Sequence, residues 1–265
     1  MSKSCLMNTM NATILALWFG VASCAFASSG EVDNTESNIH LTVVTEDWPP
    51  LNYLTKDGKI TGYVTEKVNK ILKHAGISYD IKLYPWARAY EMARTEPNVM
   101  IYSIAHTSSR DPLFHWVGSL KKERLYFWGL KSQFSSAVDE YTSLKHKKVA
   151  ASRLSNVAEF LEKEEFKQIY HLIKEDQNML MLYRKRVDLI VATELTLKTR
   201  AKKLGLDFNK MIKLKEVIEL NNDLSIAFNF QSSPELVKQY QEAYAQLVAS
   251  GKLQQIKDKW QISTN

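Results

Sequence analysis

From residue 40 onward, short runs of β-branched and apolar residues alternate with segments whose apolar residues recur every three or four positions. The first kind of pattern is typical of strands and the second of amphipathic helices. Trp48-Pro49-Pro50 ends the first strand, and Asp57-Gly58 predicts the turn of a small hairpin. In the first part of the chain, the pattern predicts strands at 40–45, 77–84 and 98–104, and helices at 65–75 and 86–95.

The same alternation continues to the C-terminus. Ser155 has the position of an N-cap, before a helix that carries Val157, Phe160 and Leu161 at helical spacing. Further strands are predicted at 124–130, 149–152, 167–173, 187–192, 212–218 and 224–228, and further helices at 178–184, 195–204, 234–250 and 252–260. Strands and helices that alternate in this way predict an α/β fold.

The N-terminal segment has the three parts of a secretory signal. Lys3 is its only charge before Glu31, the run 12–22 is apolar, and Ala25-Phe26-Ala27 supplies small residues for cleavage. Residues 1–27 are therefore predicted to be a signal peptide, and residues 28–37 a polar linker. A second interpretation stays open, because Val21-Ala22-Ser23-Cys24 also matches a bacterial lipoprotein motif that would anchor the chain through Cys24.

Composition excludes several classes of function. Both cysteines, Cys5 and Cys24, lie in the predicted leader, so the mature chain would have neither a disulfide nor a catalytic thiol. The formal net charge of +6 is spread in short clusters, which does not indicate nucleic-acid binding. The six histidines show no metal-ligand spacing, and no phosphate loop or nucleophile elbow is present. We expect no metal, no cofactor and no nucleic acid.

Arg110 is the most informative residue of the chain. It follows a helix and a strand in the sequence Thr107-Ser108-Ser109-Arg110, which places it beyond the carboxyl end of that strand. Open α/β sheets bind ligands at this edge, and a guanidinium group matches the geometry of a carboxylate.

Several motifs in a fixed order resemble the family 3 extracellular solute-binding proteins, the periplasmic receptors of ABC importers. An aromatic-proline loop follows the first strand, Gly62-Tyr63 enters the first helix, and a helix with Trp86 precedes the strand and Thr107-x-x-Arg110. Further matches are Leu144-Lys145-x-x-x-Val149, Arg186-Val187-Asp188 and a last helix ending in Lys259-Trp260. The segments 84–89 and 116–118 are similar to a proteobacterial subgroup whose ligands are mostly unassigned.

The resemblance implies the two-lobed type II periplasmic-binding-protein fold. Each lobe would be a mixed sheet flanked by helices, and two crossover strands would serve as the hinge. Lobe 1 is predicted to comprise residues 38–122 plus 221–265, and lobe 2 residues 123–220.

The resemblance also implies a ligand site between the lobes. Arg110 has the position of the carboxylate-binding arginine, Trp48 that of an aromatic residue against the ligand, and Ser155 and Asn156 those of polar groups at a helix N-terminus. Tyr102, Ser103 and Ala105 occupy the adjoining end of the strand. Trp86 is assigned to the core of lobe 1.

One position departs from the family pattern. The aspartate that receives the α-ammonium group in amino-acid receptors is replaced by Thr193, and Glu194 is adjacent to it. One residue along a strand points to the opposite face, so Glu194 substitutes only if the strand has already ended.

Three functions remain open from the sequence. The first is a monomeric receptor, without enzymatic activity, that delivers a small carboxylate-bearing ligand such as an amino acid to the permease of an ABC importer. The second is a receptor that reports ligand to a membrane sensor. The third is a dehydratase-like enzyme in which Glu46 or Glu194 acts as a general acid.

Overall fold

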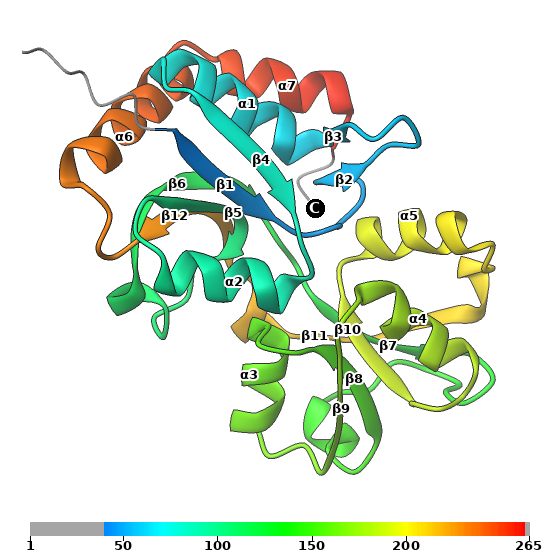
Figure 1. Ribbon diagram of the computed structural model, residues 1–265. Helices are drawn as coiled ribbons and strands as arrows, with labels where there is room; N and C mark the ends of the chain where they lie inside the picture. Colours follow the sequence, from blue (N-terminus) through cyan, green and yellow to red (C-terminus); the bar gives the residue numbers. More distant parts are fainter. Residues whose placement is uncertain (1–39, 263–265) are drawn as a thin grey trace, which may run out of the picture. The chain divides into compact units, whose positions relative to one another are not determined.

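The computed structural model describes residues 40–262, and these belong to one compact unit. The predicted leader, both cysteines and the cleavage site lie outside the described residues. Two five-stranded sheets organise the described chain (Figure 1). Among these residues, no helix combines the length and apolar character needed to cross a bilayer.

The first sheet has the strand order β4-β1-β5-β12-β6. β1 pairs in parallel with β4 and β5, whereas β12 runs antiparallel to both β5 and β6. Its strands are β1 (Leu41–Thr45), β4 (Tyr79–Leu83), β5 (Val99–Ala105), β6 (Phe114–Lys122) and β12 (Asp223–Asn229). Segments from both ends of the described chain therefore build one sheet, which defines lobe 1.

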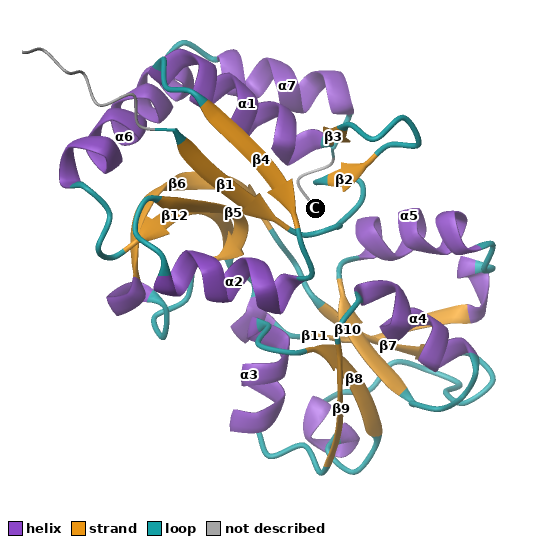
Figure 2. Cartoon of the chain, in the orientation of Figure 1, coloured by secondary structure: helices purple, strands orange, loops and turns teal. Residues whose placement is uncertain are grey.

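Helices cover both faces of the lobe 1 sheet (Figure 2). Buried residues of α1, α6 and α7 form one core with the sheet, and those of α2 form a second core on the opposite face. The helices are α1 (Tyr63–Ala75), α2 (Trp86–Thr95), α6 (Pro234–Ala249) and α7 (Lys252–Trp260). A small hairpin, β2 (Tyr53–Leu54) with β3 (Ile60–Thr61), precedes α1.

Gly62 fixes the entry into α1. Its φ of 130° is rare for other residues, and a Cβ atom there would lie 2.3 Å from the carbonyl oxygen of Leu51. Only glycine allows this close approach of two backbone segments. The Gly62-Tyr63 motif therefore has a steric cause.

The second sheet, in lobe 2, repeats the arrangement with the order β11-β7-β10-β8-β9. Its strands are β7 (Tyr126–Leu130), β8 (Lys148–Ser152), β9 (Gln168–Leu172), β10 (Leu189–Ala192) and β11 (Met211–Glu216). Helix α3 (Asn156–Lys163) packs on one face, and α4 (Glu175–Tyr183) and α5 (Glu194–Leu204) pack on the other. Four single-turn 3₁₀ segments lie at 111–113, 141–144, 208–210 and 218–220.

Two connections join the sheets, one at 123–125 between β6 and β7 and the other at 217–222 between β11 and β12. They are hydrogen-bonded to each other: Glu123 N donates to Asn222 O at 3.2 Å, and Val217 N donates to Leu125 O at 2.8 Å. The predicted lobe boundaries at 122/123 and 220/221 fall within these connections.

The two-lobed type II fold predicted from the sequence is confirmed, and two elements differ from their predicted form. Strand β6 was not predicted, because its register against β12 shifts twice and its buried positions do not alternate. Helix α4 begins at Glu175 instead of Asn178. The earlier start brings two carboxylates, Glu175 and Asp176, to the N-terminal end of this helix.

Candidate functional site

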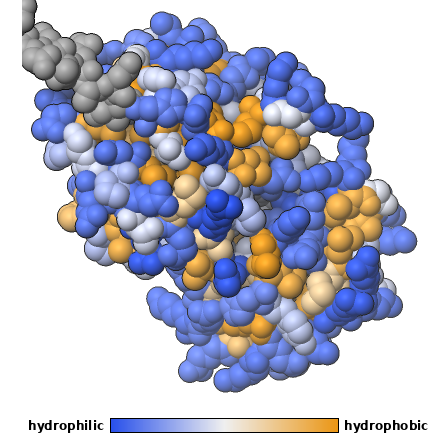
Figure 3. Space-filling model, in the orientation of Figure 1, coloured by the Kyte–Doolittle hydropathy of each residue, from blue (hydrophilic) through white to orange (hydrophobic). Residues whose placement is uncertain are grey.

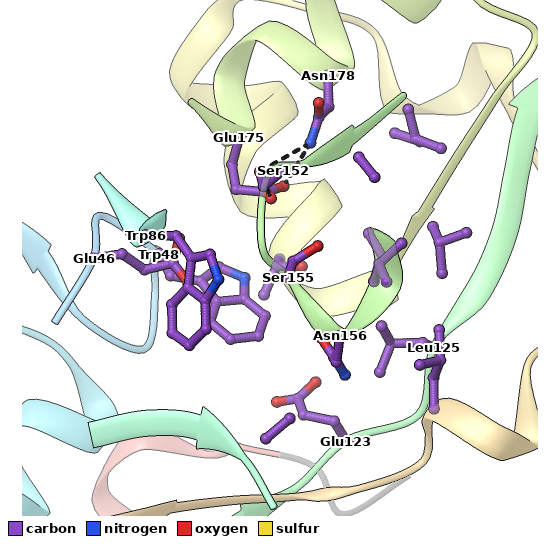
Figure 4. Close-up of a pocket in the computed structure, with 18 of the residues that line it drawn as sticks. Glu46, Trp48, Trp86, Glu123, Leu125, Ser152, Ser155, Asn156, Glu175 and Asn178 are labelled. Atoms are coloured by element: carbon purple, nitrogen blue, oxygen red, sulfur yellow. Dashed lines mark hydrogen bonds between the residues drawn. The ribbon is translucent and has the colours of Figure 1, made fainter. Parts of the chain in front are cut away.

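A cleft between the lobes holds most of the predicted ligand residues. Arg110, Trp48, Ser103 and Ala105 line it from lobe 1, and Ser155 and Asn156 line it from lobe 2. Figure 4 shows the side chains of both lobes directed toward one cavity.

Arg110 is placed by a turn after the fully buried strand β5, in which its backbone N–H donates to Thr107 O at 2.9 Å. The residue is only 1% exposed. Its Nη1 donates to Ala105 O at 3.2 Å, and its guanidinium carbon lies 5.3 Å and 4.9 Å from the ring centroids of Trp86 and Tyr90. Arg110 is therefore not a surface arginine, because the protein encloses its charged group.

The same guanidinium contacts lobe 2. Its Nη2 donates to Glu159 Oε1 at 3.3 Å and to Leu154 O at 3.4 Å. The Trp86 indole Nε1 donates to the same Leu154 carbonyl at 2.8 Å. These contacts connect the ligand-facing end of β5 directly to the segment that leads into α3.

A second set of contacts joins the lobes near α5. Lys203 Nζ lies 2.8 Å from Asp47 Oδ2 of lobe 1 and 3.2 Å from Asp176 Oδ2 of lobe 2. The three groups are partly exposed, so these ion pairs contribute little stability individually. They show that the lobes are in contact on both sides of the cleft.

Ser155 and Asn156 have the local positions predicted for them. Ser155 is the N-cap of α3, where its Oγ accepts a hydrogen bond from Ala158 N at 3.1 Å, and Asn156 is the first helical residue. On the lobe 1 side, Ser103 Oγ donates to Asn52 Oδ1 at 2.6 Å, and Asn52 Nδ2 donates to Glu46 O at 2.6 Å. This chain of hydrogen bonds positions the loop that carries Glu46 and Trp48.

Tyr102 does not line the cleft, in contrast to the prediction. Its hydroxyl lies 2.9 Å from Thr65 Oγ1 in the lobe 1 core, and burial raises its pKa. The strand is irregular here: Ser103 has a positive φ of 60° at a register shift between β5 and β12, and Ser103, not Tyr102, lines the cleft.

Thr193 and Glu194 also lie outside the cleft. Thr193 is the N-cap of α5, and Glu194 pairs with Lys198 and Lys213, each at 2.6 Å. Hydrogen bonds from these two lysines lower the pKa of Glu194. Both residues line a separate cavity beside the hinge, so neither replaces the family aspartate as a ligand group in the main cleft.

Three carboxylates line the cleft that the sequence did not assign to ligand binding. Glu46 follows β1, Glu123 lies in the first lobe connection, and Glu175 opens α4. Other unassigned lining residues are Trp86, Ser152, Asn178 and Arg200. Trp86 packs in the core as predicted but also reaches the cleft. Glu46 could have been recognised from its position directly after the first predicted strand. Glu175 could not, because the helix was predicted to begin at 178.

Glu175 is held by its own lobe. Ser152 donates to Glu175 Oε1 through a short hydrogen bond, and Asn178 Nδ2 donates to Oε2 at 3.2 Å, as the dashed lines of Figure 4 show. Burial and then the charge of Glu175 raise the pKa of Glu46 to about 8. Burial also raises the pKa of Glu123. The cleft therefore disfavours negative charge on Glu46 and Glu123.

Within residues 40–262, no group of three or more His, Cys, Asp or Glu side chains is arranged to hold a metal ion. The exposed large apolar side chains are dispersed over several elements: Leu54, Ile173, Ile218, Phe230 and Val248. The face shown in Figure 3 is accordingly hydrophilic over most of its area. The cleft remains the site with the clearest binding chemistry.

Several solved structures are similar to this chain in fold. A histidine kinase sensor domain with similarity to periplasmic binding proteins has a TM-score of 0.74 at 17% identity, covering 83% of this chain and 95% of its own. An ancestral arginine-binding protein bound to arginine has a TM-score of 0.72 at 17% identity, covering 83% and 97%. The arginine-, lysine-, histidine-binding protein ArtJ of Geobacillus stearothermophilus has a TM-score of 0.71 at 20% identity, covering 84% and 95%.

At these identities the likeness establishes the fold: the chain has the architecture of the periplasmic binding proteins. A search of the curated proteins finds no match. The family model of the bacterial extracellular solute-binding proteins, family 3, matches residues 41–122, the segment that contains Trp48, Glu46 and Arg110. The family match over residues 41–122 and the shared fold both agree with the resemblance to the family 3 solute-binding proteins seen in the sequence.

Proposed function

We propose that this protein captures a small ligand, an amino acid or a related compound, between its two lobes and presents it to a membrane partner. The proposal depends on the location of the buried polar atoms that have no hydrogen-bond partner. Among the described residues, five buried side-chain atoms have no hydrogen-bond partner, and four of them line the cleft: Arg110 Nε, Asn178 Oδ1 and both carboxylate oxygens of Glu123.

Buried polar atoms without partners are costly, by roughly 1–3 kcal/mol each. A ligand that fills the cleft would relieve that cost. Arg110 Nε is a donor and fits a ligand carboxylate, whereas Asn178 Oδ1 and Glu123 are acceptors and fit an ammonium group. An amino acid or a related compound carries both kinds of group.

A thermal-shift screen of the purified protein against amino acids, oxo acids, amines and short peptides tests this proposal. A ligand at a hundred times its dissociation constant adds about 2.7 kcal/mol to the free energy of unfolding, which raises Tm by several degrees in a protein of this size. If no compound of the four classes shifts Tm, the proposal fails.

We propose binding without chemical conversion, and delivery to the permease of an ABC importer. A periplasmic location is proposed with it, either after cleavage at Ala27 or through an anchor at Cys24. Mass spectrometry of the ligand after incubation should recover it unchanged. A product would instead indicate an enzyme, with Glu46 as the candidate general acid because its pKa of about 8 suits proton donation at neutral pH.

Signalling is the second candidate, and the similarity to a histidine kinase sensor domain favours it. A receptor of either kind would close on its ligand and dock on a membrane protein. Genes adjacent to the coding gene separate the two, since a permease and an ATPase indicate transport, whereas a kinase or cyclase with a periplasmic domain indicates sensing.

A further inference from the structure

The balance of charge in the cleft limits what the ligand can be. Arg110 and Arg200 are the basic residues among those that line it, and each is already paired with an acid outside the lining. Arg110 contacts Glu159 at 3.3 Å, and Arg200 forms a short ion pair with Asp176. Among the residues that line the cleft, no unpaired basic side chain therefore faces the three carboxylates, and Lys121, outside the lining, pairs with Glu123 alone.

Glu123 is the more unusual of these acids. Its side chain is 2% exposed, and neither carboxylate oxygen accepts a hydrogen bond. The Lys121 ammonium lies 2.7 Å from Oε1 and also donates to Lys122 O, so it offsets part of the charge of Glu123 from outside the residues that line the cleft. Figure 4 shows the carboxylate pointing into the cavity beside Asn156. A buried carboxylate in this position lacks a donor on its cavity side.

Glu46 and Glu175 form the other acidic position. They come from different lobes, and both side chains line the same cleft, as Figure 4 shows. The charged groups that act on Glu46 are Glu175, Arg200, Asp47 and Arg110. Like charges that face one cleft from two lobes oppose lobe closure unless a proton or a cation lies between them.

The surfaces between the acidic positions are aromatic. Figure 4 shows the indole groups of Trp48 and Trp86 beside Glu46, and both residues line the cleft. Indole faces bind apolar chains and also attract cations. The arrangement suits a ligand with an apolar spacer between polar ends.

We propose that the ligand carries two cationic nitrogens, one bound between Glu46 and Glu175 and the other bound by Glu123. The inference rests on the proposed capture of a ligand in the cleft. It gives the receptor an ammonium site that does not depend on position 193, where the family aspartate is replaced by a threonine. Glu123 lies in the lobe connection, so the second cation also contacts the hinge.

Two classes of compound share this chemistry, diamines and diamino acids. Isothermal titration with 1,5-diaminopentane and with L-lysine separates them, because only lysine offers a carboxylate to Arg110. L-glutamine and 1-aminopentane serve as ligands of lower charge. We expect at least one dication to bind ten-fold or more tightly than both of these compounds.

Variants connect the binding to the proposed groups. Glu123→Gln and Glu46→Gln should each weaken binding of the dication ten-fold or more while leaving 1-aminopentane binding within three-fold in the Glu123→Gln variant. Glu96→Gln removes an exposed carboxylate on lobe 1 and is the matched control, for which we expect unchanged affinity.

Two results overturn the inference. If L-glutamine or another neutral amino acid binds as tightly as either dication, the cleft does not select two charges, although the proposed capture function stands. If dications bind but Glu123→Gln has the affinity of Glu96→Gln, the hinge carboxylate is not part of the site. Failure of both dications to bind overturns the inference, whereas the proposed capture function falls only if the wider thermal-shift screen also finds no ligand.

Discussion

Binding of a cation at Glu46 should release a proton. Burial and the charge of Glu175 raise the pKa of Glu46 from 4.5 to about 8 in the unliganded cleft. A carboxyl group with that pKa is about 90% protonated at pH 7. Because a bound ammonium group interacts with the carboxylate form, each binding event at pH 7 should release about 0.9 proton from this site, by the same titration arithmetic.

The same reasoning predicts how affinity depends on pH. Between pH 6 and pH 7 the association constant should rise about ten-fold, and above pH 8 it should level off, because each unit below the pKa costs 1.36 kcal/mol for deprotonation. Amine groups of lysine and 1,5-diaminopentane keep their charge over this range, so the change comes from the protein.

Isothermal titration in several buffers of different ionisation enthalpy measures the proton directly. At pH 7 the observed enthalpy, plotted against the ionisation enthalpy of the buffer, should have a slope that corresponds to about 0.9 proton released. Glu46→Gln should remove the slope, and Glu96→Gln should keep it. A slope near zero for the unsubstituted protein would refute the role of Glu46 as a proton-linked cation site.

Folding without ligand should show the opposite trend at the same residue. The folded protein holds the Glu46 proton more tightly than the unfolded chain, so the stabilising contribution is complete below pH 4.5 and is lost as the pH rises through about 8. Glu46→Gln should therefore raise Tm most at pH 8 and least at pH 5. An equal change in Tm at both values would contradict the raised pKa.

Three further variants test other parts of the structure. Arg110→Ala should weaken binding of a carboxylate ligand such as L-lysine roughly ten- to hundred-fold with an unchanged far-UV circular dichroism spectrum, since losing a charge-assisted pair costs roughly 1.5–3 kcal/mol; calorimetry that finds unchanged affinity for such a ligand would reject its ligand role. Glu159→Gln removes the charged contact of Arg110 with lobe 2 and should increase the radius of gyration of the unliganded protein in small-angle scattering, whereas an identical scattering profile would show that this contact does not hold the lobes together. Gly62→Ala should lower Tm by several degrees, because its Cβ would lie 2.3 Å from Leu51 O, and an unaltered Tm would show that the backbone adjusts freely there.

Most helices and strands could be predicted from local sequence patterns. Strands β1, β5 and β10 consist of buried β-branched and apolar residues, and α1 ends at Gly76, which has the left-handed conformation expected of a helix stop. Strand β6 was missed because its pairing contains irregularities that depend on β12, a strand about a hundred residues away. The residues of β6 alone do not indicate which distant strand it pairs with.

The candidate site was predictable where a side chain is placed by its own element. Arg110 after β5 and Ser155 at the start of α3 reached the cleft, since a strand end and a helix N-cap fix their directions. Thr193 has the same kind of N-cap position, yet it faces another cavity because the start of α5 turns it away from the cleft. The correspondence of Thr193 with the aspartate of the family was therefore not enough to predict which way its side chain points.

The sequence by itself determined the class of fold, the order of its elements and the position of Arg110, one of two buried arginines at the cleft. Only the tertiary structure decided which charges meet there. Glu46, Glu123 and Glu175 are separated by 50 or more residues in the chain, and their common environment arises when two sheets face each other across the lobe connections. Electrostatic interactions depend on distance in space and on burial, and both are properties of the folded chain.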